Sequence, residues 1–316
     1  MKPESETIVS IMNGYKKSFI LATAIKLDLF NKIHSTFSDI SSLAASCVMN
    51  NESMKRFLRV LECMEFVNIN ENKVELTSRG LCTLIDSELQ DYLLISSCNW
   101  IQDWSNLFEI LTIGKQSDGT SWNQRAKNPK VDFAFHQFMV SSQSNVLNIP
   151  ININEGKIID LGGGLGFTLA SVLNNKPNVR GVLFDLPHVI KHAKNLVLSH
   201  MAYQGRCEFV DGSFLEIIPS GGDLYLLNNI LHDWDDEYVK KILKNIYQAM
   251  RPGAKLVITE IFIPESNNDE YAAMTDIHLM VVHGGRKRTL TEYQKMLSII
   301  GFNTLSTTFD SIEVEK

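Results

Sequence analysis

Side chains with acid–base chemistry follow two consecutive predicted strands. The segment DLYLLNNILHDWDD, Asp223 to Asp236, places His232 and Asp233 after an apolar strand, and the next strand, KLVITE, ends at Glu260. An imidazole titrates near neutral pH, and a neighbouring carboxylate favours the charged form created when the ring accepts a proton. His232 is therefore a candidate general base. The alternative is that it only caps the helix expected at about Asp235.

A glycine-rich turn forms a second candidate site. The run IIDLGGGLGF, Ile158 to Phe167, predicts a buried strand, a turn and the start of a helix. Gly162 and Gly164 have no Cβ, so their backbone can approach a ligand closely. Asp185 follows Gly164 by 21 residues and ends a second strand, GVLFD. In doubly wound folds, such a turn and a distal acid hold a nucleoside, with the carboxylate on the ribose hydroxyls.

The glycine spacing separates two nucleoside cofactors. A dinucleotide site expects the pattern G-x-G-x-x-G, but Phe167 occupies the position of the last glycine. Asp160, just before the turn, would repel a phosphate and suits an amino or sulfonium group. The pattern thus favours S-adenosylmethionine (SAM) over NAD. The alternative is a glycine-rich turn of some other α/β enzyme.

Composition places the chain among ordinary globular proteins. It has 316 residues, 44% hydrophobic and 21% charged, with a net charge of −6, which is long enough for two domains. The acidic balance argues against a nucleic-acid partner, because phosphate binding needs clustered Lys and Arg. Five scattered cysteines predict reduced thiols and neither disulfides nor a zinc site. With no signal peptide or membrane-spanning run recognised, we expect a cytoplasmic protein.

From Lys157 onward, predicted strands and helices alternate. The strands are KIIDL, GVLFD, CEFV, DLYLLN and KLVITE, with closing strands near Phe302 and Ile312. The helices are expected at about Phe167, Pro187, Asp235, Tyr271 and Thr289, the last with a capping box. This order predicts an α/β fold with a doubly wound, Rossmann-like sheet. Ligands bind such sheets at the carboxyl ends of the parallel strands, where the candidate residues lie.

Residues 1–95 are predicted to be mainly helical. Apolar residues recur at helical spacing from Ile8 to Ile20 and from Met54 to Met64, and FVNINENKVELT, Phe66 to Thr77, alternates like a hairpin. Helix, helix and hairpin make a winged-helix arrangement. Its second helix mixes basic and acidic residues, which argues against DNA binding. We instead expect a dimerisation domain that uses the apolar Ser18 to Phe30 helix.

Residues 96–316 are expected to hold a helical substrate-binding segment and a SAM core at about 155–316. The helical segment is rich in aromatic residues. Most of these would pack in a core, but pockets for aromatic ligands have similar linings. Phe138 and Met139 are the candidate pocket residues.

Five segments resemble, in order, the caffeic-acid-type plant and bacterial small-molecule O-methyltransferases: IIDLGGGLGF, FDLPHVI, CEFVDGSFLEIIPSGGDLYLLNNILHDWDD, MRPGAKLVITEIFIPE and GGRKRTLTEYQKMLSIIGF. The resemblance covers the whole chain, because this family also begins with a winged-helix dimerisation domain. It implies a class I SAM-dependent enzyme that forms a homodimer. It also implies methyl transfer to a hydroxyl, often phenolic, of a small natural product.

The resemblance also assigns roles to individual residues. His232 matches the family's catalytic base, which removes the acceptor's proton without a metal, and Glu260 matches the carboxylate that positions this base. Asp185 would hold the ribose hydroxyls of the cofactor. The cofactor-binding positions that the resemblance implies are Gly162, Gly164, Asp185, Leu186, Ser213, Phe214 and Asn228.

Two of these cofactor positions depart from the family pattern. Many relatives carry an adenine-facing Asp where this chain has Ser213, a substitution that occurs in bacterial members. Plant members carry a Lys where this chain has Asn228. The resemblance therefore implies a weakened or altered cofactor contact at Asn228, within a site that still binds SAM.

A third departure falls beside the predicted base. In GGRKRT, Lys287 replaces the family's second base-orienting Glu. A cation there would lower the pKa of His232 and remove one carboxylate partner. Some relatives of this fold perform hydroxylation, decarboxylation or pericyclic chemistry without methyl transfer, and an ammonium in the pocket would suit such reactions. The other alternative is that Lys287 points to solvent with Arg286 and Arg288.

Overall fold

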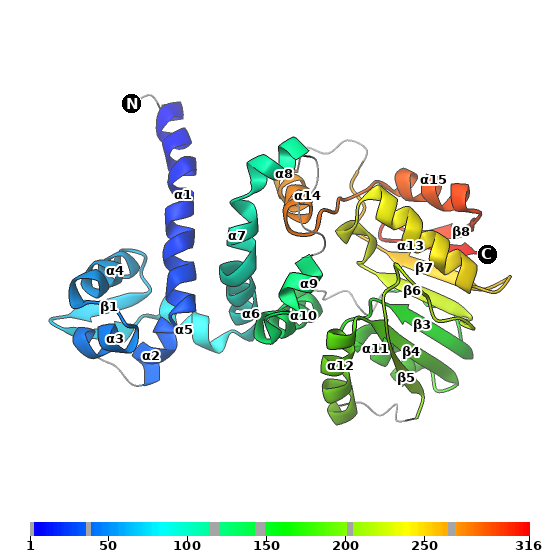
Figure 1. Cartoon of the computed structure of the whole chain (residues 1–316), viewed down its shortest axis with the longest axis horizontal. Helices are drawn as coiled ribbons and strands as arrows, with labels where there is room; N and C mark the ends of the chain where they lie inside the picture. The colour runs from blue at the N-terminus through cyan, green and yellow to red at the C-terminus, as the bar shows by residue number, and fades with distance from the viewer. Residues whose placement is uncertain (1–2, 36–38, 114–120, 143–148, 201–204, 265–268) are drawn as a thin grey trace. The chain divides into compact units, whose positions relative to one another are not determined.

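The structure, a computed structural model, describes residues 3–35, 39–113, 121–142, 149–200, 205–264 and 269–316 (Figure 1). Two compact units make up the chain: Met1–Ser105 with Asn128–Phe138, and Asn106–Lys127 with Met139–Lys316. Among the described residues, no helix combines the length and the apolar character that crossing a membrane requires. The predicted functional division after residue 95 stays a prediction.

The first unit is mainly helical and contains one hairpin. Its helices are α1 (Pro3–Lys26), α2 (Leu29–Ser35), α3 (Ile40–Ser46), α4 (Asn51–Cys63), α5 (Ser78–Ile85), α6 (Ser87–Ile95), η1 (Ser96–Trp100), α7 (Ile101–Trp104) and most of α10 (Pro129–Ser142). Strands β1 (Val67–Asn70) and β2 (Lys73–Leu76) pair antiparallel, which confirms the predicted hairpin. Phe138 packs its ring against Tyr92 and Trp100, at centroid distances of 5.5 and 6.4 Å.

The apolar segment from Ser18 to Phe30 is not one helix, so this detail of the prediction is wrong. α1 ends at Lys26, and Asp28 adopts φ of 53°, a left-handed conformation that Asp tolerates better than most residues. Phe30, at the start of α2, is then buried in the core of the first unit. Ile8, Ile11, Met12 and Tyr15 are exposed earlier in α1, and Phe19 is exposed near the start of the Ser18 to Phe30 segment.

The second unit contains a seven-stranded sheet in the order β5-β4-β3-β6-β7-β9-β8. The strands are β3 (Gly156–Leu161), β4 (Val179–Asp185), β5 (Cys207–Asp211), β6 (Leu224–Asn228), β7 (Lys255–Thr259), β8 (Asn303–Thr307) and β9 (Ser311–Glu315). β3 to β7 are parallel, which confirms the doubly wound α/β fold. β9 runs antiparallel to both β7 and β8, and its antiparallel pairing with β8 follows from the short turn that joins these two strands.

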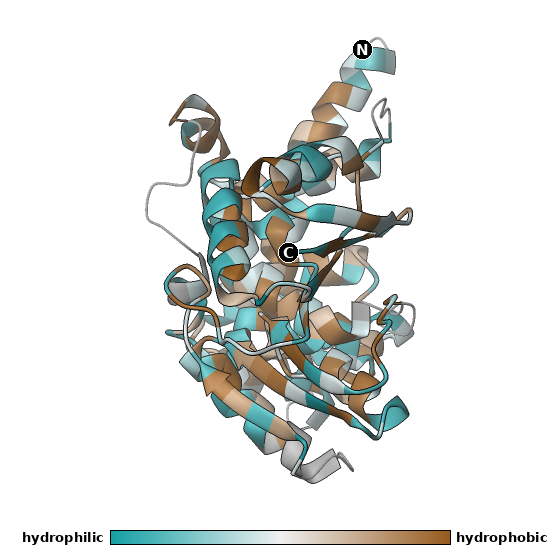
Figure 2. Cartoon of the chain, turned by 90° about the vertical axis from the view of Figure 1, so that its right-hand side faces the viewer, coloured by the Kyte–Doolittle hydropathy of each residue, from teal (hydrophilic) through white to brown (hydrophobic). Residues whose placement is uncertain are grey.

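Helices cover both faces of this sheet (Figure 1). The helices of the second unit are α8 (Leu107–Ile113), α9 (Ser121–Arg125), α11 (Phe167–Asn175), α12 (Pro187–His200), α13 (Asp236–Ala249), α14 (Glu270–His283) and α15 (Leu290–Ile300). Ile158 packs with α11 and α12, whereas its neighbour Ile159 packs with α13 and α15. The strands are therefore apolar on both faces, and brown stretches run along them in Figure 2.

The strand order decides where a ligand can bind. β3 has β4 on one side and β6 on the other, so the chain crosses over in opposite directions from the middle of the sheet. Such a switch point leaves a crevice outside the carboxyl ends of the strands. The glycine-rich turn follows β3, and a short 3-10 turn, η3 (Leu231–Asp233), follows β6. The two candidate sites therefore lie after adjacent strands.

Candidate active site

The glycine-rich turn joins β3 to α11, as predicted. Gly162 and Gly164 adopt φ of 69° and 58°, a region that side chains with a Cβ rarely enter. Asp185, at the end of β4, accepts hydrogen bonds from the N–H groups of Gly164 at 2.8 Å and Leu186 at 2.7 Å. The structure thus brings together four predicted cofactor residues, with the carboxylate bonded directly to the turn.

Asp160 is a buried acid directly beneath this turn. It is 1% exposed, and neither of its carboxyl oxygens has a hydrogen-bond partner among the described residues. Burial and the nearby Asp185 raise the pKa of Asp160 to about 7. A Cβ added to Gly163 would lie 2.6 Å from Asp160 Oδ2. A bare turn over an acid that lacks a hydrogen-bond donor fits a ligand with a cationic group, and SAM has an amino and a sulfonium group.

Phe214 and Ser213 follow β5 on the same side of the sheet. A Cβ added to Gly162 would lie 3.4 Å from the Phe214 ring, which places this ring beside the glycine turn. The same ring meets Trp234 edge to face at a centroid distance of 5.6 Å. Ser213 Oγ accepts a hydrogen bond from the Leu215 N–H. Phe214 is therefore fixed at the turn, as its predicted adenine contact requires.

Asn228 ends β6 and links it to two neighbouring elements. Its Nδ2 donates to Thr168 Oγ1 of α11 at 3.3 Å, and its Oδ1 accepts from Thr259 Oγ1 of β7 at 2.6 Å. These contacts fix the amide where α11 and β7 approach β6. A contact of Asn228 with the cofactor stays a prediction.

The side chain of Glu260 bonds to both the backbone and the ring of His232. Glu260 is 3% exposed, and its Oε1 accepts the N–H groups of Leu231 at 2.8 Å and His232 at 3.3 Å. Its Oε2 lies 2.6 Å from His232 Nδ1. The interpretation of His232 as a helix cap is wrong, because Asp235 caps α13 by accepting two backbone N–H groups. The structure therefore confirms the proximity of the two residues.

Asp233 lies between two imidazoles, a relation that the sequence analysis missed. Its Oδ1 is 3.6 Å from His232 Nε2 and 3.7 Å from His283 Nε2. His283 stacks on Trp122 at a centroid distance of 4.8 Å, and Arg125 Cζ lies over the Trp122 ring, 4.5 Å from its centroid. Burial, with the charges of Arg125 and His232, holds the pKa of His283 well below its usual value. His283 is therefore neutral, and Asp233 faces His232 as the charged partner.

The pKa of His232 reflects opposing effects. Burial by itself lowers it, but the charges of Glu260 and Asp233 raise it more, to about 9. The charge of Lys287 opposes these two carboxylates. In Asp233, burial raises the pKa to about 6 against the lowering effect of His232. At neutral pH the site therefore holds a protonated imidazole between two carboxylates.

Arg288 holds the turn that carries His232, which the sequence analysis also missed. It is 1% exposed, and it donates to the carbonyls of Leu231 at 3.0 Å and Trp234 at 2.7 Å and to Asp236 Oδ1 at 2.8 Å. The interpretation of GGRKRT as a solvent-facing basic cluster is therefore wrong for Arg288. No signal in the sequence distinguished Arg288 from Arg286 and Lys287 beside it.

Gly285 explains why this loop can approach so closely. A Cβ at Gly285 would lie 2.1 Å from the His232 carbonyl oxygen and 2.5 Å from the Asp233 carbonyl carbon. Both atoms belong to backbone, so a side chain could be accommodated only if the turn moved. The glycine thus permits direct packing of the GGRKRT loop on η3.

Lys287 is half-buried between the two arginines. Its backbone N–H donates to Asp276 Oδ1 of α14 at 2.7 Å. Burial lowers the pKa of its ammonium, and the charges of Asp276, Glu260 and Asp269 partly offset this effect. Because its charge acts on both His232 and Glu260, the ammonium belongs to the electrostatic surroundings of the predicted base.

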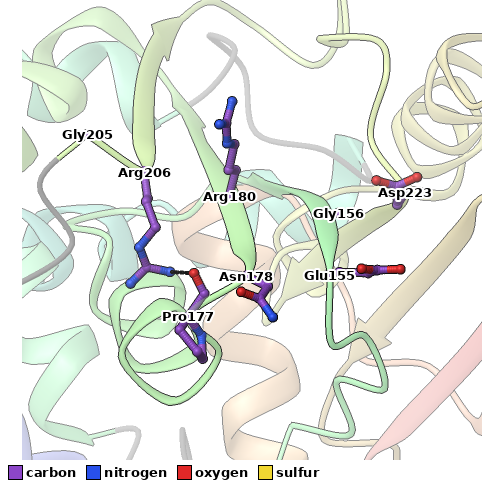
Figure 3. Close-up of a pocket in the computed structure, with 8 residues that line it drawn as sticks. All are labelled: Glu155, Gly156, Pro177, Asn178, Arg180, Gly205, Arg206 and Asp223. Carbon is purple, nitrogen blue, oxygen red and sulfur yellow. Dashed lines mark hydrogen bonds between the residues drawn. The ribbon is translucent and has the colours of Figure 1, made fainter.

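A polar cavity of about 770 Å³ lies at the opposite end of the sheet (Figure 3). Gly156 at the start of β3 and Arg180 near the start of β4 line it. Arg206 donates to the carbonyls of Leu173 at 2.7 Å and Pro177 at 3.3 Å, so this guanidinium ties together the chain around the cavity. Far from the carboxyl ends of the strands, the cavity includes none of the predicted site residues.

A doubly wound sheet with a bare glycine turn and a distal acid defines a class of nucleoside-cofactor enzymes. Within that class, the chain belongs to the O-methyltransferase family, because the model of an O-methyltransferase domain matches residues 101–303. It is a SAM-dependent O-methyltransferase, as the resemblance implied.

Individual relatives support the same family. The phenazine O-methyltransferase PhzM of Lysobacter antibioticus is 28% identical over 313 residues, 95% of this chain and 91% of the relative. Myricetin 3'-O-methyltransferase 4 of Solanum lycopersicum is 30% identical over 329 residues, with 92% and 88% covered. The solved structure of PigF with SAH is 20% identical and has a TM-score of 0.83, with 98% of this chain and 99% of that chain covered. This last likeness shows the shared fold.

Proposed function

We propose that this enzyme methylates a hydroxyl of a small aromatic natural product, with His232 as the general base. The contact of 2.6 Å between His232 Nδ1 and Glu260 Oε2 carries the proposal. A carboxylate at this distance accepts a hydrogen bond from Nδ1–H, so Nε2 is the nitrogen that can take a proton from the acceptor. Glu260 then stabilises the imidazolium that forms.

The cofactor residues support the same reaction. Bound SAM supplies a methyl group on a positively charged sulfur, which a hydroxyl oxygen can attack. Asp185 and the turn at Gly162 and Gly164 would hold the nucleoside, and Asp160 provides an acid for its cationic part. Holding two reactants at attack distance is worth about 7–11 kcal/mol of the barrier. Positioning, together with proton removal by His232, would account for the catalysis.

An aromatic acceptor is supported by the relatives. Phenazine and myricetin, which name two of them, are aromatic compounds. The acceptor of this chain is proposed to share that character.

A homodimer is also proposed. The described part of α1 exposes Ile11, Met12 and Tyr15 by more than half of their surface. Large apolar side chains grouped on one long helix usually mark a partner surface. A second copy of the chain is the partner that the family resemblance implies.

Replacement of the base tests the proposed function. We expect His232→Gln to lower kcat by about 10²- to 10⁴-fold, since general-base catalysis contributes that much. SAM affinity, measured by calorimetry, should stay within error, because the substituted ring does not touch the glycine turn. His34→Gln, in an exposed position of the first unit, is the control. Formation of S-adenosylhomocysteine and of methylated product should be followed together with a panel of phenols.

Two outcomes would count against the proposed function. Full kcat in His232→Gln would remove this residue from the proton transfer. Turnover of an acceptor with no consumption of SAM would favour the non-methylating alternative, in which Lys287 acts on the acceptor.

A further inference from the structure

We propose, on the basis of the general-base role proposed above, that His283 is a positioning residue for His232 and acts through Asp233. The buried His283 ring holds the Asp233 carboxylate beside His232. This carboxylate and Glu260 then both stabilise the imidazolium that forms when His232 Nε2 takes the acceptor's proton. Trp122 of α9 in turn fixes the His283 ring.

The first support is the geometry around a single carboxylate oxygen. Asp233 Oδ1 lies 3.6 Å from His232 Nε2 and 3.7 Å from His283 Nε2. Both distances are longer than a hydrogen bond, so Asp233 leaves His232 Nε2 able to take a proton from the acceptor. A charge at this distance still stabilises a cation where little water is present. Asp233 is therefore placed to stabilise the charged ring without occupying its base nitrogen.

The second support is burial. The side chains of Asp233 and His283 are only 10% and 6% exposed, so protein groups and not water surround the carboxylate. The groups that face Asp233 are listed by their charge effects and contacts: His232, His283, Glu260 and Arg125. Glu260 carries a like charge and repels the carboxylate. His283 lies about as close to it as His232 does, and its ring can therefore restrict where the carboxylate lies.

The third support is the charge of His283. Burial, with the charges of Arg125 and His232, holds the pKa of His283 well below its usual value, so this ring is neutral. A neutral imidazole can direct an N–H dipole at Asp233 without cancelling its negative charge. A second imidazolium would cancel that charge and compete with His232. His283 therefore orients Asp233 and leaves its charge to the proposed base.

Trp122 holds the His283 ring from α9. The two rings stack at a centroid distance of 4.8 Å and an interplanar angle of 17°. Arg125 Cζ lies 4.5 Å from the Trp122 centroid, and Arg125 is itself 1% exposed. Stacked rings and cation–π contacts favour defined geometries. Contacts thus run from α9 through His283 and Asp233 to the proposed base.

The titration of His232 tests this role without turnover, by NMR of the protein with isotope-labelled histidine. Asp233→Asn removes a carboxylate that raises the pKa of His232, so the titration midpoint should fall. His283→Leu should lower it in the same direction, because Asp233 is no longer held beside the ring. His283→Gln, which keeps a side-chain N–H, should retain the wild-type midpoint. The double variant His283→Leu with Asp233→Asn should titrate like Asp233→Asn alone, since the effect passes through Asp233.

Turnover of a phenol gives a second readout. On the plateau above pH 9, His283→Leu should lower kcat about tenfold, a usual size for coupling between residues in contact, and leave the KM for SAM unchanged. His283→Gln should restore most of this loss. Val282→Ala, which removes buried volume from the same helix, is the control. It should lower the free energy of unfolding and keep the wild-type kcat and His232 midpoint.

The wild type alone can also contradict the inference. The ring nitrogen shifts of His283 should show a neutral imidazole with its proton on Nε2 throughout the titration of His232. A proton on Nδ1 instead would overturn the inference. So would an unchanged His232 midpoint or plateau kcat in His283→Leu, or an equal loss in His283→Gln. If no phenol is methylated while the midpoints shift as expected, the proposed function fails and the positioning of His232 by His283 stands.

Discussion

The charged neighbours of His232, the proposed general base, control its protonation. Two carboxylates, Glu260 and Asp233, lie within 2.6 and 3.6 Å of its two ring nitrogens. They favour the protonated ring, whereas a general base must begin without that proton. Below a pH of about 9, His232 is therefore mainly protonated, the state in which it could not act as the proposed base.

This charge state predicts how activity depends on pH. Since His232 has a pKa of about 9, kcat/KM for a neutral acceptor should rise from pH 6.5 and level off above pH 9. Glu260→Gln removes a carboxylate that raises this pKa, so its profile should level off at lower pH. A titration of kcat/KM at fixed ionic strength measures both. A wild-type profile that is flat between pH 6.5 and 9 would contradict the assignment of His232 as the titrating base.

The same pKa shift affects stability with a defined sign. A folded-state pKa above the ordinary value of 6.5 means that folding favours the protonated ring. This contribution to stability is fully present below pH 6.5 and is lost as the pH rises through about 9. Between pH 6.5 and about 9, the protein thus loses this stabilisation while the fraction of deprotonated His232 rises.

At the scale of elements, the loop between α14 and α15 supports η3, the turn that carries the proposed base. Gly285 lets this loop pack on the backbone of η3, and Arg288 donates to carbonyls on both sides of His232. The capping box formed by Thr289 and Glu292 starts α15 directly after Arg288. The loop therefore fixes the position of the base from a distant part of the chain.

Loss of Arg288 should measure this support. In Arg288→Met, the carbonyls of Leu231 and Trp234 lose their donor, at a cost of about 1–3 kcal/mol for each buried group. We expect a lower free energy of unfolding in urea and a reduced kcat. Arg286→Met is the matched control, because its guanidinium is 39% exposed and its pairs with acids are worth about 1 kcal/mol or less. Equal losses in the two variants would show that Arg288 has no special structural role.

At the scale of the whole molecule, the exposed apolar side chains of α1 predict self-association. Light scattering after size exclusion should give about twice the chain mass of 35.7 kDa for the wild type. The double variant Ile11→Glu with Tyr15→Glu should shift the mass to that of a monomer, because it buries two charges in the proposed interface. Phe309→Glu, at an exposed position of the second unit, should remain a dimer. A monomeric wild type at micromolar concentration would contradict the homodimer.

The sequence predicted the features that depend on local interactions. The alternation of strands and helices, the glycine turn, and the helix starts at about Phe167 and Thr289 were confirmed. Each follows from residues a few positions apart, through backbone conformation and capping. The strand ends then located His232, Glu260 and Asp185, because parallel strands bring their carboxyl ends to one edge of the sheet.

The tertiary structure decided the features that depend on residues far apart in the chain. Arg288 reaches the Leu231 carbonyl across 57 positions, and Glu260 reaches His232 across 28. Burial and charge from such contacts set the pKa of His232, and they separate Lys287 from its two paired arginine neighbours. Residues that are close in the sequence do not determine these distances. The sequence could therefore identify the family and the glycine turn and predict His232 as a candidate base, while packing alone determined the electrostatic surroundings of His232.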